Sequence, residues 1–354
     1  MDDDRILLAV DGNSLLHRAF HAQASTGLRD AAGRPMWAVR GLLSQLVAAA
    51  ERIGPAAIVV GFDDPAASRR RERWPQYKAT RTEKLPTLVD QLDLAVEVLR
   101  AMGVRVVVPE GLEADDVLAS VAAAAPGLGA RTVIVTSDRD SFALIDGTTS
   151  VLRIINGGVE ASPLLTPARL ETMLGIAPAQ YRDYAALRGD ASDNLPGVRG
   201  IGPKTAAKLL RAIGSARAAF DDVAGAGTAV AAAVGDGAAR RLREPGARTA
   251  WELNCQVMAM HRTVPLGLEP PAGPGYLPLP ADAVRAAFAA QQLTWTAGTA
   301  LRVLAGVDEP RAAGAPASMP APRRDWSPRP WHRAEARGVA RLPAKPATQQ
   351  LSLF

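Results

Sequence analysis

Acidic residues follow nearly every strand-like apolar run in the first half of this sequence. Each comes directly after such a run, opens the helix-like segment behind it, or stands in the later GDASDN segment. These acids are Asp11, Asp63, Glu113, Asp115, Asp116, Asp138, Asp140, Asp190 and Asp193. Gathered carboxylates raise one another's pKa values unless cations compensate them. Mg²⁺ and Mn²⁺ prefer carboxylate and water oxygens, and two such ions can activate water against a phosphodiester. The pattern therefore indicates metal-dependent phosphodiester hydrolysis.

Each acid taken alone has an ordinary structural explanation. Aspartate is a common turn residue after a strand, and acids in the first turn of a helix are favoured as caps. The repetition is what favours a shared site, because the carboxyl ends of parallel strands meet at one edge of a sheet.

A basic segment follows Asp63 directly. Residues 69–84 read RRRERWPQYKATRTEK and carry seven cations against two acids. Cations beside the acidic edge can hold the scissile phosphate and offset charge in the transition state. Trp74 and Tyr77 offer surfaces for base stacking. The alternative is a solvated run of charge, and the position next to the acids favours the functional interpretation.

A glycine-rich turn begins a predicted helix at 203–214. Gly200 and Gly202 let backbone amides approach a phosphate, and a helix N-terminus favours the anion. Lys204 and Lys208 lie one turn apart and add charge to one face. Such contacts fix the position of a nucleic acid without reading its sequence.

The surrounding pattern alternates strands and helices. Apolar runs predict strands at 5–10, 56–62, 104–108, 132–137 and 151–155, with helices at 41–53, 88–102 and 113–125 between them. We expect an α/β nuclease domain over 1–165 with a mainly parallel, Rossmann-like sheet and a basic segment at 64–86.

The pattern turns helical after Thr166. We expect an α-helical region over 166–304 with a duplex-binding turn at 195–212. The stretch from Thr263 is ambiguous and holds one plausible helix at 281–293. Proline, alanine and arginine dominate residues 310–349, a composition that buries little apolar surface, so we expect a disordered linker over 305–349.

Composition excludes several classes of protein. The single cysteine, Cys255, excludes a disulfide scaffold and any zinc or iron–sulfur site built from several cysteines. No apolar run approaches the roughly 20 residues of a membrane span, and the acidic start is unlike a signal peptide. Eight basic and two acidic residues lie in 310–354, so the tail supplies the net charge of +5 and the body is nearly neutral. We expect a cytoplasmic protein without a membrane partner.

The motifs LLAVDGN, VVGFD, YKATR, GLEADDVLA, VTSDRD and LRGDASDNLPGVRGIGPKTAAKLL resemble the 5′-nuclease family, which includes flap endonucleases and the 5′→3′ exonuclease domain of bacterial DNA polymerase I. The resemblance covers about 6–262, and because no polymerase pattern follows in this sequence, we expect a stand-alone member of the family. It implies one metal cluster at Asp11, Asp63, Glu113 and Asp115 with Asp116 adjoining. It implies a second at Asp138, Asp140 and Asp193 with Asp190 nearby.

The resemblance also implies the remaining roles. Arg70, Lys78 and Arg81 match the catalytic cations of the family, and the basic segment matches its helical arch. The glycine turn matches its helix-hairpin-helix element, which holds duplex DNA through K⁺. His17 replaces a tyrosine that stacks on a base in many members. We expect His17, Arg18 and Tyr77 to contact DNA, with a charge on His17 that can change near neutral pH, and His21 to be structural.

The last five residues form a separate motif. Gln350, Leu351, Ser352, Leu353 and Phe354 resemble the peptide that docks bacterial replication and repair proteins on the sliding clamp. A flexible tether would raise the local concentration of the nuclease at DNA. The alternative is a frayed tail with incidental apolar residues.

The sequence thus predicts a monomeric, nucleoid-associated, metal-dependent 5′→3′ exonuclease and flap endonuclease that uses two or more Mg²⁺ or Mn²⁺ ions. Its substrate is DNA with a 5′ flap or 5′ end, including an RNA-primed end, in replication or repair. Two alternatives stay open: a structure-specific DNA-binding protein without catalysis, and a PIN-like ribonuclease.

Overall fold

A mostly parallel sheet brings three strand ends side by side. The structure, a computed structural model, describes residues 5–30, 32–270 and 272–308. Its main strands are β1 (Ile6–Asp11), β2 (Ala57–Gly61), β3 (Arg105–Val107), β4 (Arg131–Thr136), β5 (Thr149–Arg153) and β6 (Leu164–Leu165). They lie in the order β3-β2-β1-β4-β5-β6, with every neighbouring pair parallel except β5 and β6. β1 lies between β2 and β4, so the ends of these three strands form one edge.

The predicted α/β class and its five strands are confirmed. The antiparallel strand β6 was not predicted, because two residues are too few to show a periodic pattern. The central strands are buried along almost their whole length, as in sheets that helices cover on both faces.

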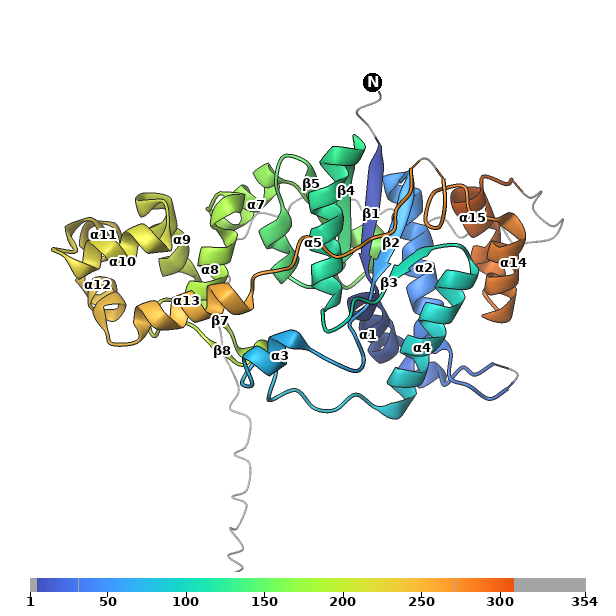
Figure 1. Cartoon of the computed structure of the whole chain (residues 1–354), viewed down its shortest axis with the longest axis horizontal. Helices are drawn as coiled ribbons and strands as arrows, with labels where there is room; N and C mark the ends of the chain where they lie inside the picture. Colours follow the sequence, from blue (N-terminus) through green and yellow to red (C-terminus); the bar gives the residue numbers. More distant parts are fainter. Residues whose placement is uncertain (1–4, 31, 271, 309–354) are drawn as a thin grey trace, which may run out of the picture. The chain divides into compact units, whose positions relative to one another are not determined.

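Alternation along β1 assigns the two faces of the sheet. Leu8 and Val10 pack in the core with α1 (Gly12–Gln23), α2 (Trp37–Ile53) and α4 (Pro86–Ala101). Leu7 and Ala9 pack on the opposite face with α5 (Ala114–Ala124). Because successive side chains point to opposite faces, Asp11 shares the α5 side. In Figure 1 the chain enters β1 at the top and α1 begins at its lower end, so the carboxyl ends of the parallel strands face downward.

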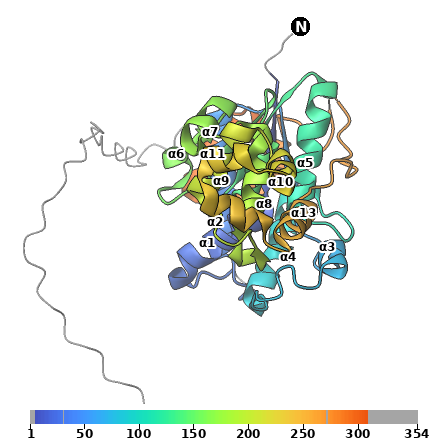
Figure 2. The ribbon, with the colours of Figure 1, turned by 90° about the vertical axis from the view of Figure 1, so that its left-hand side faces the viewer.

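A helical region follows the sheet. α6 (Gly158–Ala161) lies between β5 and β6, and the helical region after β6 comprises α7 (Pro167–Leu174), α8 (Tyr181–Arg188), the β7–β8 ribbon (Gly189–Asp190 and Leu195–Pro196), α9 (Pro203–Ile213), α10 (Ala216–Ala224), α11 (Thr228–Val234), α12 (Asp236–Arg243) and α13 (Ala247–Val257). Helices α9–α13 gather beyond α8 on one side of the sheet (Figures 1 and 2).

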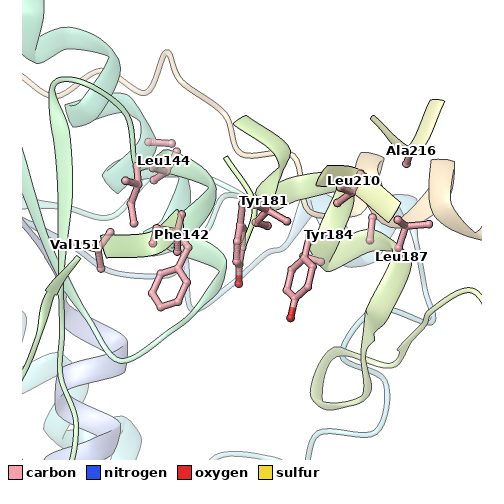
Figure 3. Close-up of a cluster of buried hydrophobic side chains, with 14 of the residues drawn as sticks. Phe142, Leu144, Val151, Tyr181, Tyr184, Leu187, Leu210 and Ala216 are labelled. Carbon is pink, nitrogen blue, oxygen red and sulfur yellow. The ribbon is translucent and has the colours of Figure 1, made fainter. Parts of the chain in front are cut away.

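A continuous apolar core joins the sheet to these helices. Figure 3 shows Phe142, which follows β4, next to Tyr181 of α8, with Tyr184 of the same helix beyond Tyr181. The ring centroids of Phe142 and Tyr181 are 5.4 Å apart, and those of Tyr181 and Tyr184 are 5.9 Å apart. The same core reaches Leu210 of α9. The acids that follow the strands of the sheet and those of the helical region are therefore held at fixed positions relative to one another.

The chain then returns to the sheet. Ile58 donates a backbone hydrogen bond to Gly275 and Leu277 donates one to Ala56, at 2.8 and 2.9 Å. Helices α14 (Ala281–Ala290) and α15 (Thr294–Ala305) follow. They join the core of α2 and α4, so the segment that the sequence left ambiguous covers the far side of the α/β layer.

Two expectations from the sequence fall on residues without a described structure. Most of the predicted linker, 305–349, and all of the predicted clamp peptide, 350–354, lie outside the described residues. In the described part of the chain, no helix is both long and apolar enough to cross a membrane.

Candidate metal and nucleic-acid site

Asp11 ends β1 and caps α1. Its Oδ1 accepts a hydrogen bond from the backbone of Ser14 at 2.9 Å, and its Oδ2 accepts one from Thr136 Oγ1 at 2.8 Å. Burial nevertheless raises the pKa of Asp11 to about 7, with added repulsion from Asp63 and Asp138. The side chain is thus fixed in place, and its negative charge needs a cation nearby.

Asp63 and Glu113 meet at the start of α5. Asp63 Oδ1 accepts a hydrogen bond from the backbone of Ala114 at 3.0 Å, while the backbone of Asp63 donates to Asn13 Oδ1 at 2.8 Å. Glu113 is the N-cap residue of α5. The end of β2 and the first turn of α5 therefore hold each other beside Asp11.

The negative charge of the Asp115 carboxylate is poorly compensated by its surroundings. Its Oδ1 is buried without a hydrogen-bond partner in the described structure. Burial raises the pKa of Asp115 well above its ordinary value, and repulsion from Asp138, Asp11 and Asp140 adds to the effect. A buried carboxylate in this position costs free energy unless a cation pairs with it.

The second predicted group lies at the junction of the sheet and the helical region. Asp138 and Asp140 follow β4, and Asp138 Oδ1 accepts a hydrogen bond from the backbone of Asp140 at 3.0 Å. Burial raises the pKa of Asp140 to about 7, with repulsion from Asp138, Asp193 and Asp190. Asp190 and Asp193 come from the β7–β8 ribbon, so the folded chain brings both halves of the predicted acid set together.

One open cavity of about 1030 Å³ collects most of these groups. Its acidic lining is Asp11, Asp63, Glu113, Asp115, Asp138 and Asp190, and its basic lining is Arg18, Lys78, Arg81, Lys84, Arg139 and Arg188. Acids and cations thus face the same space. A polyanion that brings phosphates into this cavity meets cations around the carboxylates.

The donor set fits hard divalent cations. The acids supply only oxygen ligands, which Mg²⁺ and Mn²⁺ prefer, and Asp115 offers a buried oxygen without a partner. Among the described residues, no three acidic, histidine or cysteine side chains stand at the spacing of ligands to one ion. Ion pairs with the basic segment engage three of the acids, Glu113, Asp116 and Asp193.

Glu113 is the acid most closely paired with cations. It accepts from Lys78 Nζ at 3.1 Å and from the Tyr77 hydroxyl at 3.1 Å, and it forms an ion pair with Arg70. Burial opposes its ionisation, but Lys78 and Arg70 outweigh this effect and lower the pKa of Glu113. The contacts place Arg70, Lys78 and Tyr77 at the edge of the acidic group, but Arg70 and Tyr77 lie outside the lining of the cavity. Tyr77 is buried, so its ring does not offer the exposed surface for base stacking that the sequence predicted.

Hydrogen bonds and an ion pair hold the turn after α3 (Arg69–Arg73) against the β7–β8 ribbon. The backbone of Lys78 donates to the carbonyl of Asp193 at 2.9 Å, and Arg81 Nη2 pairs with Asp193 Oδ1 at 2.5 Å. Asn194 Nδ2 donates to the carbonyl of Gln76 at 2.8 Å. Lys78 has a φ of 56°, a left-handed conformation that is uncommon outside glycine. No pattern in the sequence indicates these contacts.

Asp116 lies apart from the other acids. Its Oδ2 accepts from the backbone of Glu113 at 3.0 Å, and its Oδ1 accepts from Arg70 at 3.0 Å and from the backbone of His261 at 2.8 Å. Both oxygens are engaged outside the acidic cavity. The contacts favour a role for Asp116 in positioning Glu113 and Arg70.

Two sequence interpretations of histidines need correction. Burial lowers the pKa of His17 to about 4, with Lys84 adding to the effect, so His17 is neutral near neutral pH. His21, which the sequence analysis assigned a structural role, is exposed and lines the cavity with His17. Arg18 also lines the cavity, where its Nη2 donates to Asn156 Oδ1 at 2.8 Å.

Further lining residues were not singled out from the sequence. The Oγ atoms of Ser14 and Ser137 are hydrogen-bonded at 2.5 Å. Both residues lie within three positions of a predicted metal ligand, so the sequence could have indicated them. Arg139 and Arg188 also adjoin predicted acids. Asn156 comes from the end of the β5 segment and has no comparable signal.

The glycine turn lies away from the acidic cavity and leads into α9. Gly200 has a φ of 77°, a left-handed backbone that favours glycine. Gly202 is the N-cap residue of α9, and Lys204 and Lys208 are exposed on that helix. The DNA contacts of these residues stay a prediction.

Comparisons with known proteins agree with this architecture. A family model described as 5′-3′ exonuclease, N-terminal resolvase-like domain, matches residues 6–175. A second, described as 5′-3′ exonuclease, C-terminal SAM fold, matches residues 176–272. The chain is 39% identical over 230 residues to DNA polymerase I of Mycobacterium bovis, covering 65% of this chain and 25% of that protein. It is 43% identical over 214 residues to thermostable DNA polymerase I of Thermus aquaticus, covering 60% and 24%. The chain thus spans about a quarter of the length of these relatives.

Solved structures show the same fold. T5 5′-exonuclease with bound zinc ions has a TM-score of 0.57 at 20% identity, covering 73% of this chain and 90% of that chain. The catalytic core of Rad2 in complex with DNA substrate has a TM-score of 0.52 at 16% identity, covering 85% and 91%. The matched domains, their order and the shared fold establish that this chain belongs to the 5′-3′ exonuclease family.

Proposed function

We propose that the protein is a divalent-metal-dependent 5′→3′ exonuclease and 5′-flap endonuclease acting on DNA. The observation that carries this proposal is the convergence of carboxylates from β1, β2, α5, β4 and the β7–β8 ribbon around one cation-bordered cavity. A bound divalent cation would compensate these carboxylates at neutral pH, and phosphodiester hydrolysis uses such cations. Family membership supports the same activity.

Each part of the site has a proposed role. Asp11, Asp63, Glu113 and Asp115 would hold one Mg²⁺ or Mn²⁺ ion, and Asp138, Asp140, Asp190 and Asp193 would hold a second. Such ions supply an activated water and charge stabilisation at the leaving oxygen. Arg81 and Lys78, with Arg70 behind them, position the scissile phosphate. His17 offers a neutral ring for a base beside the phosphate, Arg18 contacts the same strand, and Tyr77 positions Glu113 through its hydrogen bond.

The duplex part of the substrate is assigned to α9. Lys204 and Lys208 can pair with phosphates, and the turn of Gly200 and Gly202 exposes backbone groups toward the nucleic acid. The family resemblance adds a K⁺ ion at this turn. These contacts would hold duplex DNA independently of its sequence while the 5′ strand enters the acidic cavity.

We place the protein in the cytoplasm at the nucleoid, as a monomer that processes 5′ flaps and RNA-primed 5′ ends in replication or repair. The terminal QLSLF sequence supports docking to the sliding clamp. Deleting residues 350–354 is expected to abolish clamp binding and leave cleavage of free flaps nearly unchanged. Retained binding by the truncated chain would refute the docking proposal.

The decisive experiment uses purified protein and a 5′-flap DNA with Mg²⁺ or EDTA, beside Asp138→Asn. We expect cleavage only with Mg²⁺ and a large loss in the variant. Cleavage in EDTA, or full activity of Asp138→Asn, would contradict the mechanism. Binding without cleavage under every metal condition would favour the non-catalytic alternative. Faster cleavage of the matched RNA flap would favour the ribonuclease.

A further inference from the structure

Two arginines at the ends of neighbouring strands have no acidic partner. Arg139 follows Asp138 just beyond β4, and Arg153 is the last residue of β5. Among the described residues, neither guanidinium forms a hydrogen bond or an ion pair, and Arg153 Nε is buried without a partner. Burial lowers the pKa of Arg153, and repulsion from Arg139 adds to the effect. Two like charges are thus left near each other, an arrangement that a bound anion would stabilise.

The register of the sheet places Arg153 on the face that carries Asp11. Thr136 of β4 pairs with Arg153 of β5, and Thr136 Oγ1 donates to Asp11 Oδ2 at 2.8 Å. Because neighbouring strands are about 4.8 Å apart, the backbones at Arg153 and Asp11 are about 10 Å apart across β4. Arg139 lines the acidic cavity and Arg153 does not. An anion held by both arginines therefore lies at the rim of this cavity, beside the acids.

The arginine pair, Arg139 and Arg153, lies between the acidic cavity and the helix assigned to duplex binding. Strand β4 separates β5 from β1, and the helices that follow α8 lie on the β5 side of the sheet (Figure 1). The centre of the Phe142 ring is 5.9 Å from Arg153 Cζ, and the same ring contacts Tyr181 of α8. Helix α8 packs in turn against α9. A strand that runs from a duplex on α9 into the acidic cavity therefore passes the arginine pair.

We propose that the arginine pair binds one backbone phosphate in the duplex part of the strand that is cut. Because a strand rises about 3.4 Å per nucleotide, this phosphate lies within about three nucleotides of the scissile one. Arginine binds phosphate through paired N–H donors, and such a contact fixes the register of a nucleic acid without reading its sequence. The pair thus determines which phosphodiester lies over the acids. The proposal rests on the proposed nuclease function and adds a determinant of the cleavage position.

The first test removes one charge from the protein and one from the DNA. In a flap substrate, the phosphates on each side of the junction are replaced one at a time by neutral methylphosphonate, and binding in EDTA is measured by fluorescence anisotropy. We expect the wild type to lose about tenfold in affinity at one position on the duplex side. Arg139→Gln should bind unmodified DNA about tenfold more weakly and lose nothing further at that position. The matched control, Arg131→Gln, replaces an exposed arginine at the opposite end of β4 and should behave as the wild type.

Arg153→Gln gives a second measurement of the same contact. Its slope of log affinity against log salt should be smaller by about 0.9, the value for one lost phosphate contact. Thermal unfolding shows whether this variant is folded, and Arg139→Gln decides alone if it is not. With Mg²⁺, Arg139→Gln should cut the flap over a wider spread of positions, while Arg131→Gln keeps the wild-type position.

Three results would overturn the proposal. The first is equal sensitivity of the wild type and Arg139→Gln to every modified phosphate. The second is a loss that Arg139→Gln abolishes only on the unpaired side of the junction, and the third is an unchanged cleavage position in Arg139→Gln. If the wild type shows the expected binding pattern but cuts no DNA with Mg²⁺, the nuclease function fails and the phosphate contact stands.

Discussion

At the scale of single residues, Asp115 is the best test of the acidic cavity. Asp115→Asn removes a buried charge that has an oxygen without a partner. We expect the free energy of unfolding in EDTA to rise by about 1 kcal/mol, while Mg²⁺-dependent cleavage falls by about a hundredfold or more. Urea unfolding and a flap-cleavage assay measure the two effects.

The matched control for Asp115→Asn is Asp64→Asn. Asp64 accepts backbone hydrogen bonds from Gly111 and Ala66, which lower its pKa. Its replacement should lower stability and not raise it. A loss of stability in Asp115→Asn would contradict the assignment of Asp115 as an uncompensated carboxylate.

The pKa values of Asp11 and Asp140 predict how stability depends on pH without metal. Both are raised from 3.8 to about 7 in the folded protein. The folded state therefore binds more protons than the unfolded state between about pH 4 and 7, and stability from these groups falls as pH rises through that window. Each contributes at most about 1.4 kcal/mol per pH unit.

Asp140→Asn isolates one of these contributions. The difference in unfolding free energy between Asp140→Asn and the wild type, measured in EDTA, should grow as pH rises from about 4 to 7. Saturating Mg²⁺ should remove most of the pH dependence of the wild type. A difference that is constant with pH would show that Asp140 titrates normally.

His17 is expected to act as a neutral ring. Because its pKa is lowered to about 4, its protonation does not change between pH 6 and 8. His17→Phe should keep the shape of the pH profile of kcat/KM over this range, and any loss should be of similar size at every pH. A profile that loses an ionisation near pH 6.5 in the variant would contradict this expectation.

At the scale of elements, the turn after α3 depends on Asn194. Its side chain donates to Gln76, and its φ of 58° lies in the left-handed region. Asn194→Ala should lower stability by about 1–2 kcal/mol and raise the KM for flap DNA, because both the hydrogen bond and the favoured backbone are lost. Asn194→Gly retains the backbone freedom and separates the two effects.

Limited proteolysis between Trp74 and Lys84 measures the loosening of this turn directly. We expect faster cleavage in Asn194→Ala and an intermediate rate in Asn194→Gly. Equal rates in the wild type and both variants would show that the ribbon does not hold the turn.

How far the sequence predicts this molecule differs between its elements. The strands and the acids at their ends were predicted because apolar periodicity and strand topology act locally and place Asp11, Asp63 and Asp138 at one edge. The hydrogen bond from Asn194 to Gln76 was not predicted, because the two residues are far apart in sequence and meet only through tertiary packing. The pKa of His17 was missed for the same reason, because it depends on burial.

At the scale of the whole molecule, the acidic site depends on the core that joins the sheet to the helical region. Phe142 lies two residues after Asp140 and packs on Tyr181 of α8, while Asp193 comes from the ribbon after α8. Phe142 is therefore placed to fix the distance between acids from the two sides. Phe142→Ala should destabilise the protein by about 3–5 kcal/mol and also weaken Mg²⁺ binding.

Phe288→Ala provides the matched control for this last effect. Phe288 is as buried as Phe142, at 0% against 2% exposure, but it lies in α14 and packs in the other core, with α2 and α4. Both variants should lose similar stability, yet only Phe142→Ala should show a smaller rise in Tm on addition of Mg²⁺, because the stabilisation by a bound ligand increases with the logarithm of its affinity. If the two variants respond equally to Mg²⁺, the acids from the ribbon do not share a site with those of the sheet.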